Sequence, residues 1–321
     1  MESHVERRFG RTNPNPNMMS CSSLPFDLIP DILSRLPVKF LLQLQCVCKS
    51  WNSLISDHQF VRKHLNRSNT HNLHCLRRPN CYSHHYTIQS NPLRSVFTRI
   101  NPNFTSLIFP SYGIHERVKF ELIGSCDGIL CLADYCLHLV ILWNPSVKKG
   151  KELPLLERTR DVSFTSIGFG YDSLADTYKV IVINKTKGKV HTLGTNFWKS
   201  IPDFPSDGLP VERKGRFVSG SGTINWLTTY FIVSFDLRKE SYQKIFLPPV
   251  VNARRLFLGV MRDSLCIIAN SDIWIIKEYG NEESWTKLFT IDKHLIRCYT
   301  IVDILCSFED DQVLIKAKGP M

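Results

Sequence analysis

The 321-residue sequence lacks several features that would assign it to common protein classes. No apolar run reaches the roughly 18 residues that a membrane-spanning helix needs, so we expect no membrane partner. The first 20 residues contain no apolar core, so we expect no secretory signal and interpret residues 1–20 as a disordered leader. We therefore expect the chain in the cytoplasm, the nucleus or both, with reduced cysteines. Buried cysteines such as Cys131 and Cys266 are then expected to act as small hydrophobic residues.

Nucleotide-binding loops are also missing. Gly168-Phe169-Gly170 has neither the third glycine nor the following helix of a dinucleotide-binding loop, and no Walker-type Gly-Lys-Ser/Thr occurs. The acidic run Glu309-Asp310-Asp311 has a turn context, which favours a solvated turn over a pair of catalytic carboxylates. We predict no cofactor.

One segment has the form Gly-x-Cys-x-Gly of a nucleophile elbow, Gly124 to Gly128. An elbow needs a helix after the nucleophile, because the nucleophile lies at the helix N-terminus. The residues that follow, 129–132, are strand-like, and Asp127-Gly128 is typical of a hairpin turn. We therefore predict no catalytic residues.

Acidic residues are absent between Asp57 and Glu116, a stretch that holds seven arginines and lysines and seven of the 11 histidines. Such a block can bind nucleic acid, but these charges are scattered and no known reader motif accompanies them, so nucleic acid is an unlikely partner. His71-x2-His74 and Cys81-x2-His84 are feasible zinc-ligand spacings, although structural zinc sites usually repeat as paired Cys-x2-Cys. We predict a polar linker with no metal and keep zinc as the alternative.

Apolar residues between positions 24 and 60 recur at intervals of three and four, which predicts short amphipathic helices. They fall at Leu28, Ile32, Leu33, Leu36, Leu41, Leu42, Leu44, Val47, Trp51, Leu54 and Ile55. Pro30 and Pro37 divide the helices, because proline is tolerated in a first helical turn and not in a helix interior. A segment of roughly 40 residues rarely buries enough apolar surface to be stable alone, so its apolar excess indicates a partner surface.

This stretch resembles an F-box. The matching segments are residues 24–25, 27–29, 32–39, 41–42 and 46–51. The resemblance implies a docking module for the Skp-family adaptor of a cullin–RING ubiquitin ligase; an ordinary helical hairpin would leave these residue identities unexplained. Some of the matching residues, Leu33 and Trp51 above all, could form the core of the module instead. The residues expected at the adaptor contact are Leu24, Pro25, Leu28, Ile29, Ile32, Leu33, Leu36, Pro37, Val38, Leu41, Leu42, Val47, Cys48, Trp51, Leu54 and Ile55.

From about residue 118 the pattern changes to short apolar runs bounded by Gly, Asp, Asn and Pro, which predicts strands and turns. The expected strands are 120–123, 129–133, 140–143, 163–169, 178–183, 189–193, 216–219, 223–227, 232–236, 243–247, 256–261, 264–269, 272–277 and 285–290. One sequence pattern recurs four times: a strand, a turn of small or charged residues, and a second strand that ends near proline. Roughly equivalent positions in the four copies are Trp143, Leu193, Phe235 and Trp274, which are 50, 42 and 39 residues apart. Four strands in each 40–50 residues are typical of β-propeller blades.

The same region resembles the plant F-box-associated interaction domain, which is related to kelch-type F-box proteins. The matching phrases are 124–132, 142–146, 168–172, 176–180, 234–237, 258–260, 272–280 and 283–287. The resemblance implies a platform that binds a target or partner protein. Two departures from the pattern are expected to matter. The segment 189–193, followed by Gly194, is shorter than the strand-turn-strand usual at that place, so one outer hairpin is expected to be frayed. Family members usually have one or more closing strands beyond the segment that matches 315–321, so either the ring is incompletely closed or residues 96–109 supply a strand.

These observations predict a small all-α F-box helical module followed by an all-β, β-propeller-like, kelch-related domain. The expected division is a leader at 1–20, the F-box module at 21–67, a basic, histidine-rich linker that could hold the first strands at 68–117, and the propeller-like domain at 118–321. The predicted function is that of a non-catalytic substrate receptor in a Skp–cullin–F-box ubiquitin ligase. A ligase-independent F-box tether is the main alternative, and a propeller-based hydrolase is a remote one. The target protein and the residues that bind it are not predicted.

Overall fold

The computed structural model describes residues 28–67, 72–77, 87–98, 105–108, 119–135, 138–156, 165–205, 207–248, 256–292, 300–307 and 313–318. The chain divides into two compact units, Met1–Ser68 and Asn69–Met321, and each is described by itself. The leader predicted at residues 1–20 lies outside the described residues. So do Leu24 and Pro25 of the predicted adaptor contact.

The first unit consists of four short helices. They are α1 (Ile29–Leu33), α2 (Val38–Leu44), α3 (Lys49–Ser56) and α4 (His58–Arg67). Pro30 lies in the first turn of α1 and Pro37 immediately precedes α2, where the missing amide hydrogens cost nothing. Asp57 caps α4, because its Oδ1 accepts a hydrogen bond of 3.1 Å from the amide of Phe60. The helices therefore begin where the proline and capping residues dictate.

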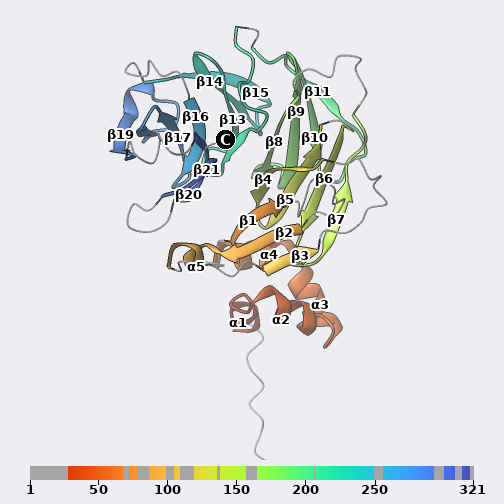
Figure 1. The fold of residues 1–321 in the computed structure, drawn as a ribbon. Coiled ribbons are helices and arrows are strands. Elements are labelled where there is room, and N and C mark those ends of the chain that lie inside the picture. Colours follow the sequence, from red (N-terminus) through yellow and green to blue (C-terminus); the bar gives the residue numbers. More distant parts are fainter. Residues whose placement is uncertain are drawn as a thin grey trace, which may run out of the picture. The chain divides into compact units, whose positions relative to one another are not determined.

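The second unit is built of antiparallel sheets (Figure 1). Its first sheet has three strands, with α5 (Leu93–Thr98) between the second and third: β1 (Asn72–Arg77), β2 (Thr87–Pro92) and β3 (Thr105–Ile108). Its last sheet has two, β20 (Thr300–Ser307) and β21 (Val313–Lys318). Four four-stranded sheets lie between these in sequence, and each is a meander of consecutive strands.

The strands of the four central sheets occur in simple chain order. The first sheet contains β4 (Glu121–Cys126), β5 (Ile129–Asp134), β6 (Leu139–Asn144) and β7 (Lys149–Glu152). The second contains β8 (Thr165–Asp172), β9 (Thr177–Asn184), β10 (Lys187–Thr192) and β11 (Lys199–Ile201). The third contains β12 (Arg216–Val218), β13 (Thr223–Leu227), β14 (Phe231–Asp236) and β15 (Ser241–Phe246). The fourth contains β16 (Leu256–Met261), β17 (Ser264–Ala269), β18 (Asp272–Ile276) and β19 (Trp285–Thr290).

The first strands of successive sheets are neighbours in space. β4 contacts β8, β8 contacts β12, β12 contacts β16, and β16 contacts β20. Each sheet therefore extends outward from an inner first strand, as a propeller blade does. The all-β propeller predicted for this region is confirmed.

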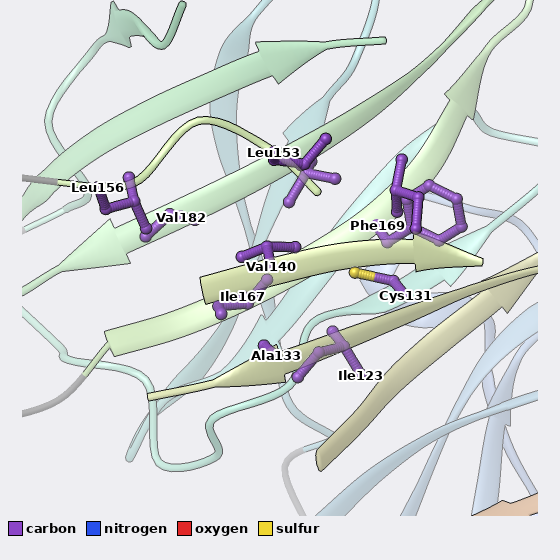
Figure 2. Packing of buried hydrophobic residues seen from close by; sticks show 11 residues of the cluster. Ile123, Cys131, Ala133, Val140, Leu153, Leu156, Ile167, Phe169 and Val182 are labelled. Atoms are coloured by element: carbon purple, nitrogen blue, oxygen red, sulfur yellow. The ribbon is translucent and has the colours of Figure 1, made fainter. Parts of the chain in front are cut away.

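The cores lie between successive sheets, so the central strands are buried on both faces. Because side chains alternate along a strand, Val180 and Val182 of β9 pack toward the preceding β4–β7 sheet, while Ile181 and Ile183 pack toward the following β12–β15 sheet. Figure 2 shows the first of these cores, in which Val140 of the β4–β7 sheet lies close to residues of the β8–β11 sheet. Burial on both faces explains why the sequence has continuous apolar runs there instead of an alternating pattern.

Cysteines fill part of this packing. Cys131 and Cys266 are free and fully buried in two different cores. Burial raises the pKa of the Cys131 thiol, because the thiolate would lose its hydration there. The prediction that these two residues act as small hydrophobic side chains is confirmed.

Polar side chains tie neighbouring blades together. Tyr178 on β9 donates a hydrogen bond of 3.0 Å to Asp127 Oδ2 in the β4–β5 turn. The ammonium group of Lys179 reaches the turn after β14, where it bonds Glu240 Oε1 at 3.0 Å and the carbonyl oxygen of Leu237 at 2.7 Å. Tyr279, which follows β18, donates at 2.7 Å to Asn225 Oδ1 on β13. Each contact joins two blades that follow each other in the chain.

The predicted strands match most of the observed ones, and the errors have physical reasons. The predicted strands 223–227, 256–261, 264–269 and 285–290 coincide with β13, β16, β17 and β19. The strand predicted at 189–193 ends at Thr192, so Leu193 was wrongly placed as an anchor within it. The strands β7 and β11 are absent from the predicted strand ranges, although the repeated sequence pattern implied a second strand before the proline at both places. All four residues of β7 are exposed, so it has no apolar signal.

The short outer hairpin predicted from the family pattern has a counterpart in the structure, whereas the strand within residues 96–109 belongs to the first sheet and, in the part of the chain that the structure describes, does not pair with the last one. The outer strand β11 is only three residues long and pairs with β10 over three positions. Within the segment 96–109, β3 pairs with β2 of the first sheet, and among the described residues β21 pairs only with β20.

Candidate functional site

Fourteen of the sixteen residues predicted at the adaptor contact are described by the structure, and they fall into three classes by burial. Leu33, Leu41 and Ile55 are buried, with exposed fractions of 3%, 4% and 6%, and together with Phe60 they form the core of the helical unit. Leu33 was one of the two residues that the sequence left between core and surface, and it lies in the core. These three side chains hold the helices together.

A second class is half-buried around this core. Ile29, Leu36, Trp51 and Leu54 pack against it, and Val38 is also half-buried. Trp51, the other ambiguous residue, therefore contacts the core while part of its surface stays accessible. A substitution in this class would change both the stability of the module and any surface that it offers.

A third class is exposed. It comprises Leu28, Ile32, Pro37, Leu42, Val47 and Cys48. Val47 is 65% exposed, Leu28 48% and Ile32 44%. Phe40 is 51% exposed and was not predicted, although its position in the apolar α2 segment could have suggested it. A module of about 40 residues thus exposes several large apolar side chains, which is typical of a protein that binds a partner.

Helix α1 provides part of this exposed apolar surface. An open hollow lies here, and its lining consists of Leu28, Asp31, Ile32, Arg35 and Leu36. The apolar members lie beside one acidic and one basic side chain. The hollow can therefore bind a partner's apolar side chain while pairing charges at its rim.

Polar contacts fix α1 against α4. Asp31 pairs with Lys63 and lies 3.3 Å from Arg67 Nη1, which also donates to Ser34 Oγ at 2.6 Å. The hydrogen bond and charge of Lys63, with a smaller contribution from Arg67, hold the pKa of Asp31 below its usual value. His64 Nδ1 lies 3.0 Å from the carbonyl oxygen of Ser34. The exposed apolar residues of α1 are thus held on a rigid helix.

A thiol lies at the start of α3. Cys48 precedes the helix, and its Sγ lies 3.1 Å from Ser50 Oγ. The hydrogen bonds of Ser50 and of the amide of Trp51 lower the pKa of this exposed thiol. Cys48 therefore contributes a polar, polarizable group to the exposed surface of the helical unit.

The other motifs weighed from the sequence form no second site. Asp127 and Gly128 have φ values of 50° and 76°, as a type I′ hairpin turn requires, and Cys126 pairs with Ile129 across it. The Gly-x-Cys-x-Gly motif is a turn and not a nucleophile elbow. Burial lowers the pKa of His74, on β1. His71, Cys81, His84, His85 and the acidic residues 309–311 lie outside the described residues.

Within the described ranges, no group of three or more His, Cys, Asp or Glu side chains has a metal-binding arrangement. None of the helices in that part of the chain combines the length and the apolar character that a membrane crossing requires.

Comparison with known proteins assigns a family to both units. Residues 21–63 match the F-box domain, and residues 82–318 match the F-box associated beta propeller domain. An F-box/kelch-repeat protein of Arabidopsis thaliana is 31% identical over 303 residues, which cover 85% of this chain and 81% of the relative. The F-box protein CPR1 of the same species is 26% identical, over 85% of this chain and 74% of its own length.

The matched domains define the class: an F-box module joined to a propeller, the arrangement of an F-box substrate adaptor. The chain belongs to the family of F-box proteins that carry an F-box associated beta propeller domain. The F-box domain implies an adaptor partner of the Skp1 type in general. Homologous F-box proteins are generally non-catalytic adaptors.

Proposed function

We propose that this protein is the substrate-receptor subunit of a Skp–cullin–F-box ubiquitin ligase. The helical unit docks the Skp-family adaptor, and the propeller recruits a target protein for ubiquitination and degradation. The observation that supports the proposal is the apolar face of the helical unit, where Leu28, Ile32, Phe40, Leu42 and Val47 are exposed although the module has its own core. Burying this face against a partner removes it from water.

The proposed mechanism is proximity. A receptor that holds its target beside a ubiquitin-loaded enzyme raises the effective concentration of the reacting groups and supplies no catalytic group of its own. The division of the chain into two compact units supports such a role, since each unit can bind its own partner.

The exposed residues form the proposed adaptor contact, and the buried ones support it. We assign Leu28, Ile32, Pro37, Leu42, Val47 and Cys48 to the contact and add Phe40. Ile29, Leu36, Val38, Trp51 and Leu54 contribute their accessible parts. Leu33, Leu41 and Ile55 act by keeping the helices in place.

Co-purification with a Skp-family adaptor tests the proposal. We expect the wild-type chain to form a stable complex. We expect Ile32→Asp and Val47→Asp each to weaken it about 10-fold or more, because an apolar contact is replaced by a desolvated charge. Both side chains are exposed, so the substitutions should leave the helical core intact.

The matched control is Leu174→Asp, which introduces the same charge at an apolar residue that is 80% exposed in the β8–β9 turn of the other unit. It should leave adaptor binding unchanged. A folded wild-type chain that binds no adaptor, or equal loss with all three variants, would contradict the proposal. If a complex forms, the target's lifetime should depend on the cullin; a target whose lifetime does not would favour a ligase-independent tether.

A further inference from the structure

Large exposed apolar side chains also gather at one place on the propeller. Leu209 and Val211 lie in the loop between β11 and β12, Tyr230 lies in the turn between β13 and β14, and Phe246 ends β15. Their exposed fractions are 48%, 55%, 71% and 53% in that order. We call these four residues the apolar patch.

The chain path brings the four residues to one end of the β12–β15 blade. In an antiparallel meander, the C-terminal end of β13, the N-terminal end of β14 and the C-terminal end of β15 lie next to one another, at the same end of the sheet. The loop that leads into β12 arrives at that end too, and the amide of Val211 donates a hydrogen bond of 2.8 Å to the carbonyl oxygen of Leu227 at the end of β13.

A buried phenylalanine joins the members of the patch. Phe231 is 4% exposed, follows Tyr230 in the chain and pairs with Phe246 across the strands, with ring centroids 6.3 Å apart. A Cβ at Gly208, next to Leu209, would lie 3.3 Å from its ring, so the loop packs closely on it. The ring of Phe246 and the loop that carries Leu209 therefore both lie against one buried ring, next to the turn that carries Tyr230.

The backbone beneath the patch is held in place. Thr228 Oγ1 donates to the carbonyl oxygen of Phe231 at 2.7 Å and accepts from its amide at 3.2 Å, which closes the turn that carries Tyr230. The amide of Phe246 donates to Glu282 Oε1, and its carbonyl oxygen accepts from Trp285 Nε1, both at 3.0 Å. Because this backbone is already ordered, a partner would bind without a large entropy cost.

Two ion pairs border the patch. Lys244 pairs with Asp207, and its ammonium lies 4.8 Å from the centroid of the Phe231 ring. Asp203, in the same loop, pairs with Lys187 at 2.6 Å. Neither sign of charge dominates at this rim among the described residues, so the surface favours a partner with apolar character and little net charge.

The size of the patch is suitable for recognition. An aromatic side chain has roughly 150–250 Å² of surface, so Tyr230 and Phe246 leave about 200–300 Å² exposed, and the aliphatic Leu209 and Val211 bring the total to the order of 400 Å². Patches of this size on soluble proteins often mark interaction sites. A standard interface buries about 800 Å² on each partner, so the patch would form its apolar centre.

We infer that the apolar patch is the surface by which the propeller binds its target, through an apolar, aromatic-containing segment of low net charge. This inference rests on the proposed receptor function. Single exposed apolar residues such as Leu174 and Phe197 need no such explanation, because they lie on separate turns at the other ends of their strands.

Selection of random peptides displayed on phage tests the inference. The full chain, in complex with its adaptor, is the bait, and Tyr230→Asp with Phe246→Asp is the counter-selected variant. We expect the enriched peptides to contain two or more aromatic or aliphatic residues and little net charge. A synthetic peptide from that pool should bind the double variant about 10-fold or more weakly than wild type. Its affinity should change little between about 0.05 and 0.5 M salt, since screening affects charges and not apolar contacts.

The variant Leu174→Asp is the control and should bind the peptide as wild type does. If the double aspartate variant melts at a lower temperature than wild type, a milder double variant, Tyr230→Ser with Phe246→Thr, is used in its place. Three outcomes would each overturn the inference. The counter-selection could leave no enriched peptide, the peptide could bind wild type and the double variant equally, or the enriched peptides could be strongly charged and bind in a salt-sensitive way. A wild-type dimer in sedimentation that the double variant disrupts would identify a second copy as the occupant and overturn it too.

Adaptor binding by the same double variant separates this inference from the proposed function. Retained adaptor binding with lost peptide binding supports both. If wild type itself binds no adaptor, the receptor function is contradicted, whatever the peptides show. If wild type binds the adaptor but no peptide binds through the apolar patch, the receptor function still holds and the inference about the patch is overturned.

Discussion

Lys179 offers a sharp test of how neighbouring blades are held together. Its side chain is 7% exposed and pairs at 3.0 Å with Asp172, which is 2% exposed in the same blade. It also pairs at 3.0 Å with Glu240 of the next blade, which is 21% exposed. The substitution Lys179→Met keeps an unbranched side chain one atom shorter and removes the charge, so both carboxylates lose a partner in a largely dry environment.

The expected cost follows from what remains after the substitution. Breaking one partner of a buried ion pair costs about 3–5 kcal/mol, because an uncompensated charge is left behind. Asp172 keeps hydrogen bonds from the amides of Leu174 and Ala175, at 3.0 and 3.1 Å. Glu240 keeps Lys199 at 2.7 Å. We therefore expect the lower end of that range, about 3 kcal/mol, which lowers the melting temperature of a domain of this size by about 6–12 °C.

Thermal and urea unfolding of the full chain measure this cost. The matched control is Lys187→Met, which removes a lysine whose pair with Asp203 is exposed, with side-chain fractions of 77% and 54%. Exposed pairs contribute about 0.5 kcal/mol or less, so the control should unfold almost as wild type does. A loss below about 1 kcal/mol for Lys179→Met, or one equal to that of the control, would refute the reasoning.

The pH dependence of the difference gives a second check. Burial opposes the charged forms of Asp172 and Glu240, but hydrogen bonds with lysine lower the pKa of both below their ordinary values of 3.8 and 4.5. Burial also opposes the charge of Lys179, but its bonds to the two acids raise its pKa above 10.5. The ion pairs therefore stabilise the fold at pH values between the pKa values of the two acids and that of the lysine. This stabilisation is lost as pH falls through the folded pKa values of the acids, and it is also lost as pH rises through the folded pKa of the lysine. The gap between wild type and Lys179→Met should therefore close in acid.

Two further predictions concern the cores of the blades. Burial lowers the pKa of His191 below 6.5, so the unfolded chain binds the proton more tightly and stability should fall below pH 6.5, by up to about 1.4 kcal/mol per pH unit. The variant His191→Gln should lose less stability in urea unfolding between pH 7 and pH 5.5, and a parallel loss would contradict this assignment. At Gly168 on β8, a Cβ would lie 2.4 Å from Ile224 Cγ2, so Gly168→Ala should cost about 1–3 kcal/mol. Gly124→Ala on β4, where a Cβ meets nothing within 4 Å, is its control, and equal melting temperatures for the two variants would show that the blades can move apart.

The propeller could be predicted from the sequence because its central strands are buried on both faces. The apolar runs of β6 and β17 are continuous for that reason, and the Asp127-Gly128 turn has a sequence signature of its own. The polar strand β7 carries no such signal, because all its residues face water. Strands were therefore predictable where they pack and not where they only complete a sheet.

The candidate site shows the same limit. The sequence pattern identified the apolar residues of the helical unit but could not divide them between core and surface, since Leu33 and Ile32 are neighbours of similar size. Only the packing of the helices shows that Leu33 is buried and Ile32 is 44% exposed. The bond between Lys179 and Glu240 spans 61 positions, so nothing local in the sequence could reveal it.

The order of the blades along the chain has a consequence for synthesis. Each of the five cores of the β unit joins sheets that follow one another in the sequence, as the core around Val180 joins the β4–β7 and β8–β11 sheets. A chain with this arrangement can complete one core after another as it leaves the ribosome, without waiting for distant segments. The helical unit is made first and has a core of its own, so the proposed adaptor contact can form while the propeller is still being translated.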